Sequence, residues 1–137
     1  MDSIKLSIKS KEKEVLEFLG ELKSILCGDS FDSNRDFVLI TTRKENELEQ
    51  FSTPFTMNKL EYDVNDVVER LKELTVKEYS ETLIDKDNTE PPLLFVFGKD
   101  LNGRLIYIKL KIKGDARRRV LCVSFHYAKE KMNFPYA

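Results

Sequence analysis

The chain contains little cysteine, and its two cysteines are not arranged to bind a metal. Cys27 and Cys122 lie far apart, and neither belongs to a Cys-x-x-Cys pair or to a cluster with histidine. We therefore expect two free thiols in a reducing compartment and no zinc or iron site. Because Cys122 lies in an apolar segment, we expect it to be a small residue of the core or sheet.

Long apolar segments are also absent. The longest apolar run covers residues 91–97, far fewer than the ~20 residues that a helix needs to span a bilayer. The N-terminal residues lead into alternating lysine and glutamate and lack the apolar stretch of a signal peptide. We therefore expect a cytoplasmic protein without membrane contact, folded as one domain over residues 1–137.

Common catalytic and nucleotide-binding motifs are missing as well. The sequence contains no Gly-x-Ser-x-Gly, no P-loop, no His-Glu-x-x-His and no Gly-x-Gly-x-x-Gly. These absences argue against a hydrolase triad, a nucleotide-binding fold and a metalloenzyme. We accordingly expect neither a cofactor nor a metal.

Charge, in contrast, is abundant and unevenly distributed. Charged residues make up 34% of the chain, and the formal net charge is −1. Residues 96–131 contain ten basic and three acidic residues, a net charge of +7, which leaves −8 for the rest of the chain. Such a chain can bind a polyanion with its basic end. A solvated, lysine- and arginine-rich hairpin without a partner would give the same pattern.

Two segments of the N-terminal half have the apolar spacing of amphipathic helices. The first begins after Ser10 as the expected N-cap, has acidic residues in its first turn and ends near Cys27. The second covers residues 62–74, with Asp63 or Asn65 as its cap. Core packing explains both apolar stripes.

The segments around these helices predict a strand and an irregular region. Residues 37–42 form a short apolar run that is typical of a buried strand. Residues 43–58 are polar, and Pro54 within them is expected to break regular structure. Residues 75–79 lead towards an edge segment, and residues 85–92 form a polar loop.

The C-terminal third predicts three strands, over residues of about 93–99, 104–113 and 118–127. Helices therefore precede most of the strands. This order predicts an α+β fold in which two to three N-terminal helices pack on one face of a C-terminal antiparallel sheet.

The turn at Asn102-Gly103 leaves two registers open for the first hairpin. A type I turn with a bulge would set Phe97 opposite Tyr107 and form an aromatic platform suited to stacking bases. A two-residue Asn-Gly turn would set Gly98 opposite Tyr107, send the phenylalanines to the core and open a notch above the glycine.

The last two strands carry the candidate site. In the middle strand Ile106, Ile108, Leu110 and Ile112 alternate with Tyr107, Lys109, Lys111 and Lys113. The apolar set must face the helices, because exposing it would cost roughly 1.5–3 kcal/mol for each side chain. In the last strand Leu121, Val123, Phe125 and Tyr127 alternate with Val120, Cys122, Ser124 and His126. If the first of these sets is core, Ser124 and His126 share the open face with Tyr107 and Lys109.

These side chains fit the cleavage of RNA through its own 2′-hydroxyl, which needs an acid, a base and cations. His126 can act as acid or base near neutral pH. Tyr107 can stack or donate a hydrogen bond, while Lys109, Lys111 or the run Arg117-Arg118-Arg119 can stabilise phosphate. Two plainer alternatives stay open: a lone histidine is more often a surface or satisfied residue, and the arginine run could be a solvated turn instead of a phosphate clamp.

Four short segments, VFGK at 96–99, NG at 102–103, IYIK at 106–109 and VSFH at 123–126, give the chain a family likeness. Over roughly residues 35–127 it resembles MqsR-type toxins, which belong to the RelE-like fold group of toxin–antitoxin ribonucleases. The ending SFH…P(F/Y) is similar to that of a divergent branch. The resemblance implies a RelE-like fold and a metal-independent mRNA endoribonuclease that a helix-turn-helix antitoxin holds inactive.

Carried over by position, the resemblance places functional residues at Tyr107 and His126, where the family has tyrosine and a strand-end lysine. Lys99 would replace a lost cation. Ser80 stands where the family has a lysine, and Leu94 where it has a glutamine. We therefore expect a toxin with His126, Tyr107 and Lys109 as catalytic residues acting on single-stranded mRNA. The phosphate and substrate contacts would come from Lys99, Lys111, Arg117, Arg118, Arg119 and Ser124. The alternative is a non-catalytic protein of the same fold that binds RNA or an acidic protein.

Overall fold

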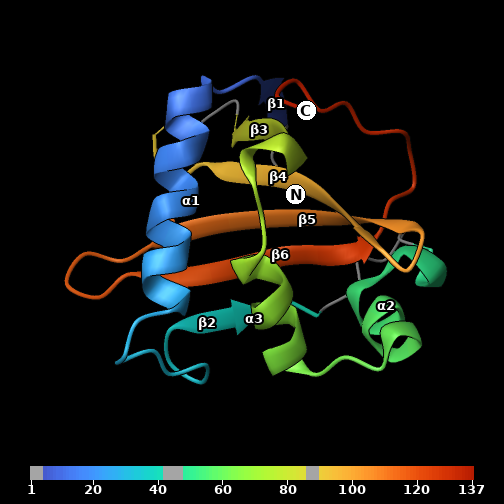
Figure 1. Ribbon diagram of the computed structural model, residues 1–137, viewed down its shortest axis with the longest axis horizontal. Helices are drawn as coiled ribbons and strands as arrows, with labels where there is room; N and C mark the ends of the chain where they lie inside the picture. The colour runs from blue at the N-terminus through green and yellow to red at the C-terminus, as the bar shows by residue number, and fades with distance from the viewer. Residues whose placement is uncertain (1–4, 42–47, 86–89) are drawn as a thin grey trace.

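The computed structural model describes residues 5–41, 48–85 and 90–137 (Figure 1). These residues form three helices and six strands. Their bounds are β1 Lys5–Ile8, α1 Glu12–Leu26, β2 Phe37–Leu39, α2 Thr53–Leu60, α3 Val64–Lys72, β3 Tyr79–Asp85, β4 Leu94–Leu101, β5 Arg104–Lys113 and β6 Arg119–Tyr127. Short 3-10 turns cover Glu49–Phe51 and Val76–Glu78.

The strands form one mixed sheet in the order β1-β3-β4-β5-β6-β2. From β3 to β6 the strands are antiparallel neighbours, as predicted for the C-terminal third, whereas β2 pairs with β6 in parallel. The α+β class is therefore confirmed, but the expectation of a purely antiparallel, C-terminal sheet is wrong. The reason is that α1 carries the chain from β1 at one edge to β2 at the opposite edge, so N-terminal strands flank the meander on both sides.

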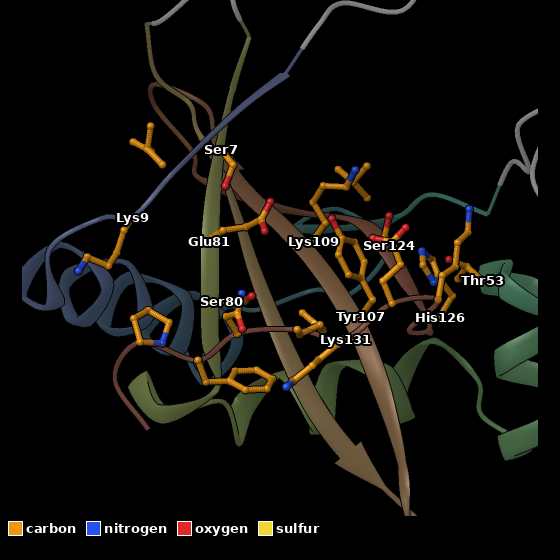
Figure 2. Close-up of a pocket in the computed structure, with 18 of the residues that line it drawn as sticks. Ser7, Lys9, Thr53, Ser80, Glu81, Tyr107, Lys109, Ser124, His126 and Lys131 are labelled. Carbon is orange, nitrogen blue, oxygen red and sulfur yellow. The ribbon is translucent and has the colours of Figure 1, made fainter.

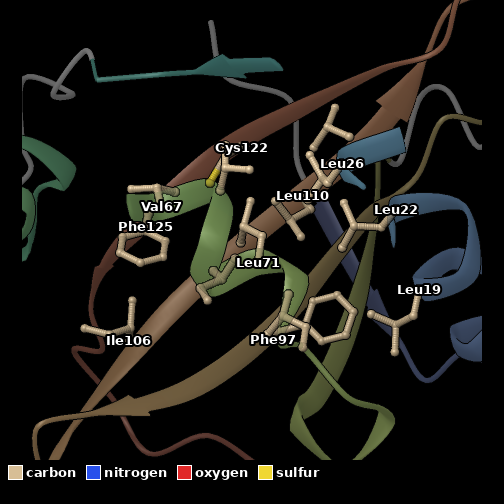
Figure 3. Close-up of a cluster of buried hydrophobic side chains, with 14 of the residues drawn as sticks. Leu19, Leu22, Leu26, Val67, Leu71, Phe97, Ile106, Leu110, Cys122 and Phe125 are labelled. Atoms are coloured by element: carbon tan, nitrogen blue, oxygen red, sulfur yellow. The ribbon is translucent and has the colours of Figure 1, made fainter. Parts of the chain in front are cut away.

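Helices α1 and α3 cover one face of this sheet, as Figure 1 shows. Their apolar stripes, with Val15, Leu19, Leu22, Leu26, Val67, Val68 and Leu71, are buried against β4, β5 and β6. The aromatic ring of Phe18 lies on that of Phe95, with 4.1 Å between the centroids. Figure 3 shows how side chains from both helices meet the sheet in one core.

Helix α2 lies in the segment expected to be irregular, so this expectation is wrong for residues 53–58. Pro54 falls in the first turn of the helix, where a missing N–H costs nothing. The hydroxyls of Thr53 and Thr56 accept hydrogen bonds from the backbone N–H groups of Phe125 and Tyr127, both at 3.1 Å. Helix α2 thus supplies hydrogen-bond acceptors for the backbone N–H groups of β6 beyond the point where β2 ends.

The start of α1 differs from the expectation in one detail. Lys11, not Ser10, occupies the N-cap position, and its backbone N–H donates to the Glu14 carboxylate at 2.8 Å. Ser10 is buried instead, and its hydroxyl lies 2.7 Å from that of Thr82 on β3. For α3 the predicted cap is confirmed, since Asp63 accepts from the N–H of Asp66 at 2.9 Å.

The first hairpin adopts the second of the two registers considered. Asn102 and Gly103 both have positive φ, 55° and 84°, and form a two-residue turn between Leu101 and Arg104. Such a turn matches the right-handed twist of the two strands. Gly98 consequently lies opposite Tyr107.

Alternation in β5 is as predicted, because Ile106, Ile108, Leu110 and Ile112 are all buried in the core. In β6 it holds for only part of the strand. Lys109 pairs with Ser124, but the next residue of β5 pairs with Cys122, so Val123 is an extra residue in a bulge. The bulge changes the facing of the strand: Val120 and Cys122 join the core, whereas Leu121 lies opposite Lys111. The expectation that Leu121 and Val123 face the core is therefore wrong, and that for Phe125 and Tyr127 is confirmed.

Candidate functional site

A broad cleft of about 1270 Å³ lies on the face of the sheet opposite α1 and α3 (Figure 2). Its floor comes from β3, β5 and β6, and its sides come from residues 7–9 and from the segment after β6. We call this last segment, residues 128–137, the C-terminal tail. Most of the lining side chains are polar, among them Lys9, Ser80, Glu81, Tyr107, Lys109, Ser124, His126, Lys129 and Lys131.

Two aromatic rings lie side by side on the floor of the cleft. Tyr107 on β5 is the cross-strand neighbour of His126 on β6. Their rings are stacked, with 5.2 Å between the centroids and 13° between the planes. On its other side Tyr107 faces Gly98, which has no side chain. We call these two stacked rings, together with the notch that Gly98 leaves beside Tyr107, the platform.

A second row of residues crosses the sheet beside this platform. Lys109 lies opposite Ser124 on one side and opposite Val96 on the other, and Val96 lies opposite Glu81 on β3. The ammonium nitrogen of Lys109 lies 5.9 Å from the centroid of the Tyr107 ring. Strand alternation thus predicted correctly which side chains gather on the uncovered face, namely Tyr107, Lys109, Ser124 and His126. Their roles stay predictions.

A backbone contact determines the tautomer of the His126 ring. The Nδ1 atom lies 2.9 Å from the carbonyl oxygen of Tyr127. Since a carbonyl oxygen can only accept, this geometry assigns the hydrogen of the neutral ring to Nδ1. The lone pair is then on Nε2, the atom at which the ring can take up a proton.

The phenol of Tyr107 is a proton donor across the physiological range. Burial, and secondly the negative charge of Glu81, raise the pKa of Tyr107 to about 12. Figure 2 shows the Glu81 and Tyr107 side chains on the same side of the sheet within the cleft. A protonated phenol can donate a hydrogen bond to an anionic oxygen but cannot act as a base near neutral pH.

Two of the lysines predicted to bind phosphate lie outside this cleft. Lys99 is the cross-strand neighbour of the core residue Ile106 and therefore projects on the helix-covered side. There its ammonium group lies 3.4 Å from the carboxylates of both Glu73 and Glu78. Lys111 is on the uncovered face but lines a separate cavity of about 180 Å³ towards the far end of the strands. Lys99 therefore does not lie in the cleft with His126, Tyr107 and Lys109.

The predicted arginine clamp is engaged in contacts within the protein. Arg117 makes a bidentate ion pair with the carboxylate of Asp36. Arg118 makes a second bidentate pair with Glu21 on α1, at 2.9 and 3.2 Å. Arg119 donates to a backbone carbonyl in the loop before β2 at 3.1 Å. The run therefore attaches the hairpin to the N-terminal half, a role that neither earlier interpretation included. Arg117 and Arg118 are nevertheless exposed at the turn, and a role in binding phosphate stays a prediction.

Several lining residues were not selected from the sequence. Glu81 lies on β3, where a second bulge between Tyr79 and Glu81 interrupts the alternation that could have marked its facing. Lys129 and Lys131 were counted in the basic segment, but no strand pattern placed them near His126. Only the path of the C-terminal tail brings them to the cleft.

Within residues 5–41, 48–85 and 90–137, no three histidine, cysteine or acidic side chains are grouped so that they could hold a metal ion. Across the same residues, no helix combines the length and apolar character needed to cross a membrane. Comparison with models of known protein families, with curated proteins and with solved structures gives no match.

Proposed function

We propose that the protein is an endoribonuclease that cleaves single-stranded mRNA in this cleft without a metal ion. The observation that carries the proposal is the platform itself. One cleft brings together a histidine with an assigned acceptor nitrogen, a phenol that stays protonated and the Lys109 ammonium group. These are the groups that transesterification of RNA requires.

The reaction uses the 2′-hydroxyl of the RNA as its own nucleophile. His126 Nε2 takes the proton from this hydroxyl as its oxygen attacks the phosphorus. The bond from phosphorus to the 5′ oxygen breaks, and the protonated imidazole returns the proton to that leaving oxygen. The products are a 2′,3′-cyclic phosphate and a free 5′-hydroxyl. Lys109 and the Tyr107 phenol stabilise the negative charge that develops on the phosphate oxygens.

The biological setting of the proposal rests on the resemblance to MqsR-type toxins. In that setting the chain is the toxin of a toxin–antitoxin pair in the cytoplasm, and a helix-turn-helix antitoxin keeps it inactive. Expression of the chain alone should then arrest growth, and His126→Gln should relieve the arrest.

A second candidate is a non-catalytic protein of the same fold that binds RNA or an acidic protein. It is favoured by the small number of cations near His126, since Lys99, Arg117 and Arg118 are paired with carboxylates elsewhere. Ser80 in the cleft, where the toxin family has a lysine, points the same way.

Incubation of the purified chain with a defined single-stranded RNA in EDTA separates these candidates. We expect cuts that leave a 2′,3′-cyclic phosphate, and a loss of about 10²–10⁴-fold in rate for His126→Gln. Lys109→Gln should also lower the rate, whereas Lys113→Gln should not. Lys113 is a matched control because it is exposed at the end of the same strand and does not line the cleft. Equal cutting by His126→Gln and the wild type, with both folded by circular dichroism, would rule out the proposed site.

A further inference from the structure

The C-terminal tail forms one side of the cleft and carries two of its lysines. The backbone N–H of Ala128 donates to the carbonyl of Leu105 at 2.9 Å, which holds the tail where it leaves β6. Lys129 and Lys131 follow directly, and both line the cleft. Figure 2 shows Lys131 on the same side of the sheet as Tyr107 and His126.

The middle of the tail packs into the notch above Gly98. A Cβ atom added to Gly98 would lie 2.8 Å from Cζ of Phe134 and 3.0 Å from Sδ of Met132. At 2.8 Å the Phe134 ring would have to shift, so glycine is what allows this ring to lie directly on β4. The notch that the hairpin register opens beside Tyr107 is thus filled by the protein's own tail.

The end of the tail is fixed at a third point. The Tyr136 hydroxyl donates to the carbonyl oxygen of Ser10 at 2.6 Å. The Tyr136 ring also stacks on that of Tyr79, with 5.9 Å between the centroids and 23° between the planes. Tyr79 is fully buried. The tail is therefore a wall of the cleft that contacts the rest of the protein both before and after its two lysines.

Charge gives this wall its chemical character. Among the basic residues of the C-terminal third, Lys99, Arg117 and Arg118 are used in ion pairs that join parts of the fold. The cleft itself is lined by four lysines and two acidic residues. Half of these lysines, Lys129 and Lys131, come from the tail, as does one of the acids, Glu130, so the tail contributes half of the net positive charge of the cleft.

We infer that the C-terminal tail is the phosphate-binding wall of the cleft, with Lys129 and Lys131 contacting the backbone of a single-stranded nucleic acid. The neighbouring Tyr107–His126 platform favours this ligand over an acidic peptide, because bases stack on flat rings while cations track the phosphates. The inference deepens the proposed function and rests on it for the choice of RNA as the ligand.

Binding of a 2′-O-methyl RNA oligonucleotide tests the inference without any cleavage, because its blocked 2′ oxygen cannot attack. Fluorescence anisotropy over a range of salt concentrations gives the affinity and its salt dependence. For the double variant Lys129→Gln/Lys131→Gln we expect weaker binding and a log–log salt slope shallower by about 1.4, since each phosphate contact on a single strand contributes about 0.7. The control Lys77→Gln/Lys113→Gln removes two exposed lysines outside the cleft and should change neither quantity.

A second variant tests the wall without touching its charges. Gly98→Val should force Phe134 out of the notch, so trypsin should cut the native protein after Lys129 and Lys131 more readily than it cuts the wild type. Binding of the 2′-O-methyl RNA should weaken in parallel. Retained binding with a detached tail would overturn the inference, as would equal salt slopes for the two double variants. Polyglutamate that competes as well as the RNA would show that the ligand class is wrong.

Failure of the inference differs from failure of the proposed function. Lysine-dependent binding of the analogue without cleavage of normal RNA would refute the ribonuclease but support the wall. Cleavage of normal RNA, with binding that does not depend on Lys129 and Lys131, would support the ribonuclease but refute the wall.

Discussion

The His126 imidazole lies parallel to the Tyr107 ring, with 5.2 Å between the centroids and 13° between the planes. The two residues are directly opposite in neighbouring antiparallel strands, a position in which side chains on one face of a sheet are in contact. Strand register therefore makes the two rings neighbours, and a substitution at one position leaves the backbone pairing of the other in place.

Replacing Tyr107 with phenylalanine keeps the stacked ring and removes only the hydroxyl. We expect RNA cleavage to fall by about 10²-fold, the effect of losing one donor to developing negative charge, while binding of the 2′-O-methyl RNA changes little. Because the pKa of Tyr107 is raised to about 12, the phenol is protonated throughout the range from pH 6 to 9. The pH–rate profiles of Tyr107→Phe and the wild type should consequently have the same shape there. A limb of the profile that disappears in the variant would show that the phenol titrates, contrary to this assignment.

The ion pair between Asp36 and Arg117 should make stability sensitive to acid. The hydrogen bond from Arg117 is the main cause that holds the pKa of Asp36 well below its usual range. The folded state therefore binds this proton less readily than the unfolded chain does. The stabilisation is complete above the ordinary aspartate pKa of 3.8 and is lost as the pH falls further.

Urea unfolding of the wild type and Asp36→Asn at pH 7, 4, 3 and 2 measures this effect. The difference in the free energy of unfolding should be largest at pH 7 and shrink below pH 4. Glu69→Gln is the matched control, because the exposed pair of Glu69 with Lys72 should contribute little at any pH. A wild-type advantage that stays constant down to pH 2 would contradict the assigned pKa direction.

Two glycine-to-alanine substitutions should have effects of opposite sign. Gly20 lies within α1 with open space around its Cα, so Gly20→Ala should stabilise the protein by about 0.5–1 kcal/mol. Gly103 also has open space, but its φ is +84°, and Gly103→Ala should destabilise by about 1–2 kcal/mol. Thermal or urea unfolding provides the comparison. Stabilisation by both would mean that the two-residue turn does not require a positive φ at position 103.

The two cysteines should differ sharply in reactivity. Cys27 is exposed at the end of α1, whereas Cys122 is fully buried in the core, where burial raises the pKa of its thiol. Since the thiolate is the reactive form, iodoacetamide should modify Cys27 in the native protein and Cys122 only after unfolding. Mass spectrometry of native and urea-treated samples reads this out. Early modification of Cys122 would show that β6 opens locally.

Sequence patterns predicted α1, α3 and the face of β5 well, because a single physical cause decided each of them, whereas α2 was missed. Four branched side chains at every second position allow only one orientation of β5, and the structure has it. The prediction that His126 lies on the uncovered face rested on a weaker assumption. Alternation was assumed along the whole of β6, and the bulge at Val123 reverses the facing of the strand's first half only. The bulge has no composition signal, since valine fits a regular strand equally well.

The cations were harder to place, because their roles depend on partners that are distant in sequence. Lys99 and Arg117 are basic residues in a basic segment, yet each contacts an acid that comes from another part of the chain, Glu73 or Asp36. Lys129 and Lys131 were missed for a different reason, because they reach the cleft only through the path of the C-terminal tail, which Phe134 on Gly98 and Tyr136 on Ser10 help to hold. The excess of basic residues in the C-terminal third therefore reflects ion pairs that stabilise the fold as well as a possible site for a polyanion.

Both outer strands of the sheet come from the first forty residues, whereas its four central strands come from residues 79–127. A ribosome thus releases β1 and β2 before their partners β3 and β6 exist, so the N-terminal segment can complete α1 but cannot pair its strands until β3 and then β6 have been synthesised. In the finished protein the same two strands cover edges that would otherwise offer unpaired backbone groups to another molecule. The sheet therefore ends in two short edge strands, of four and three residues, instead of the longer strands β3 and β6.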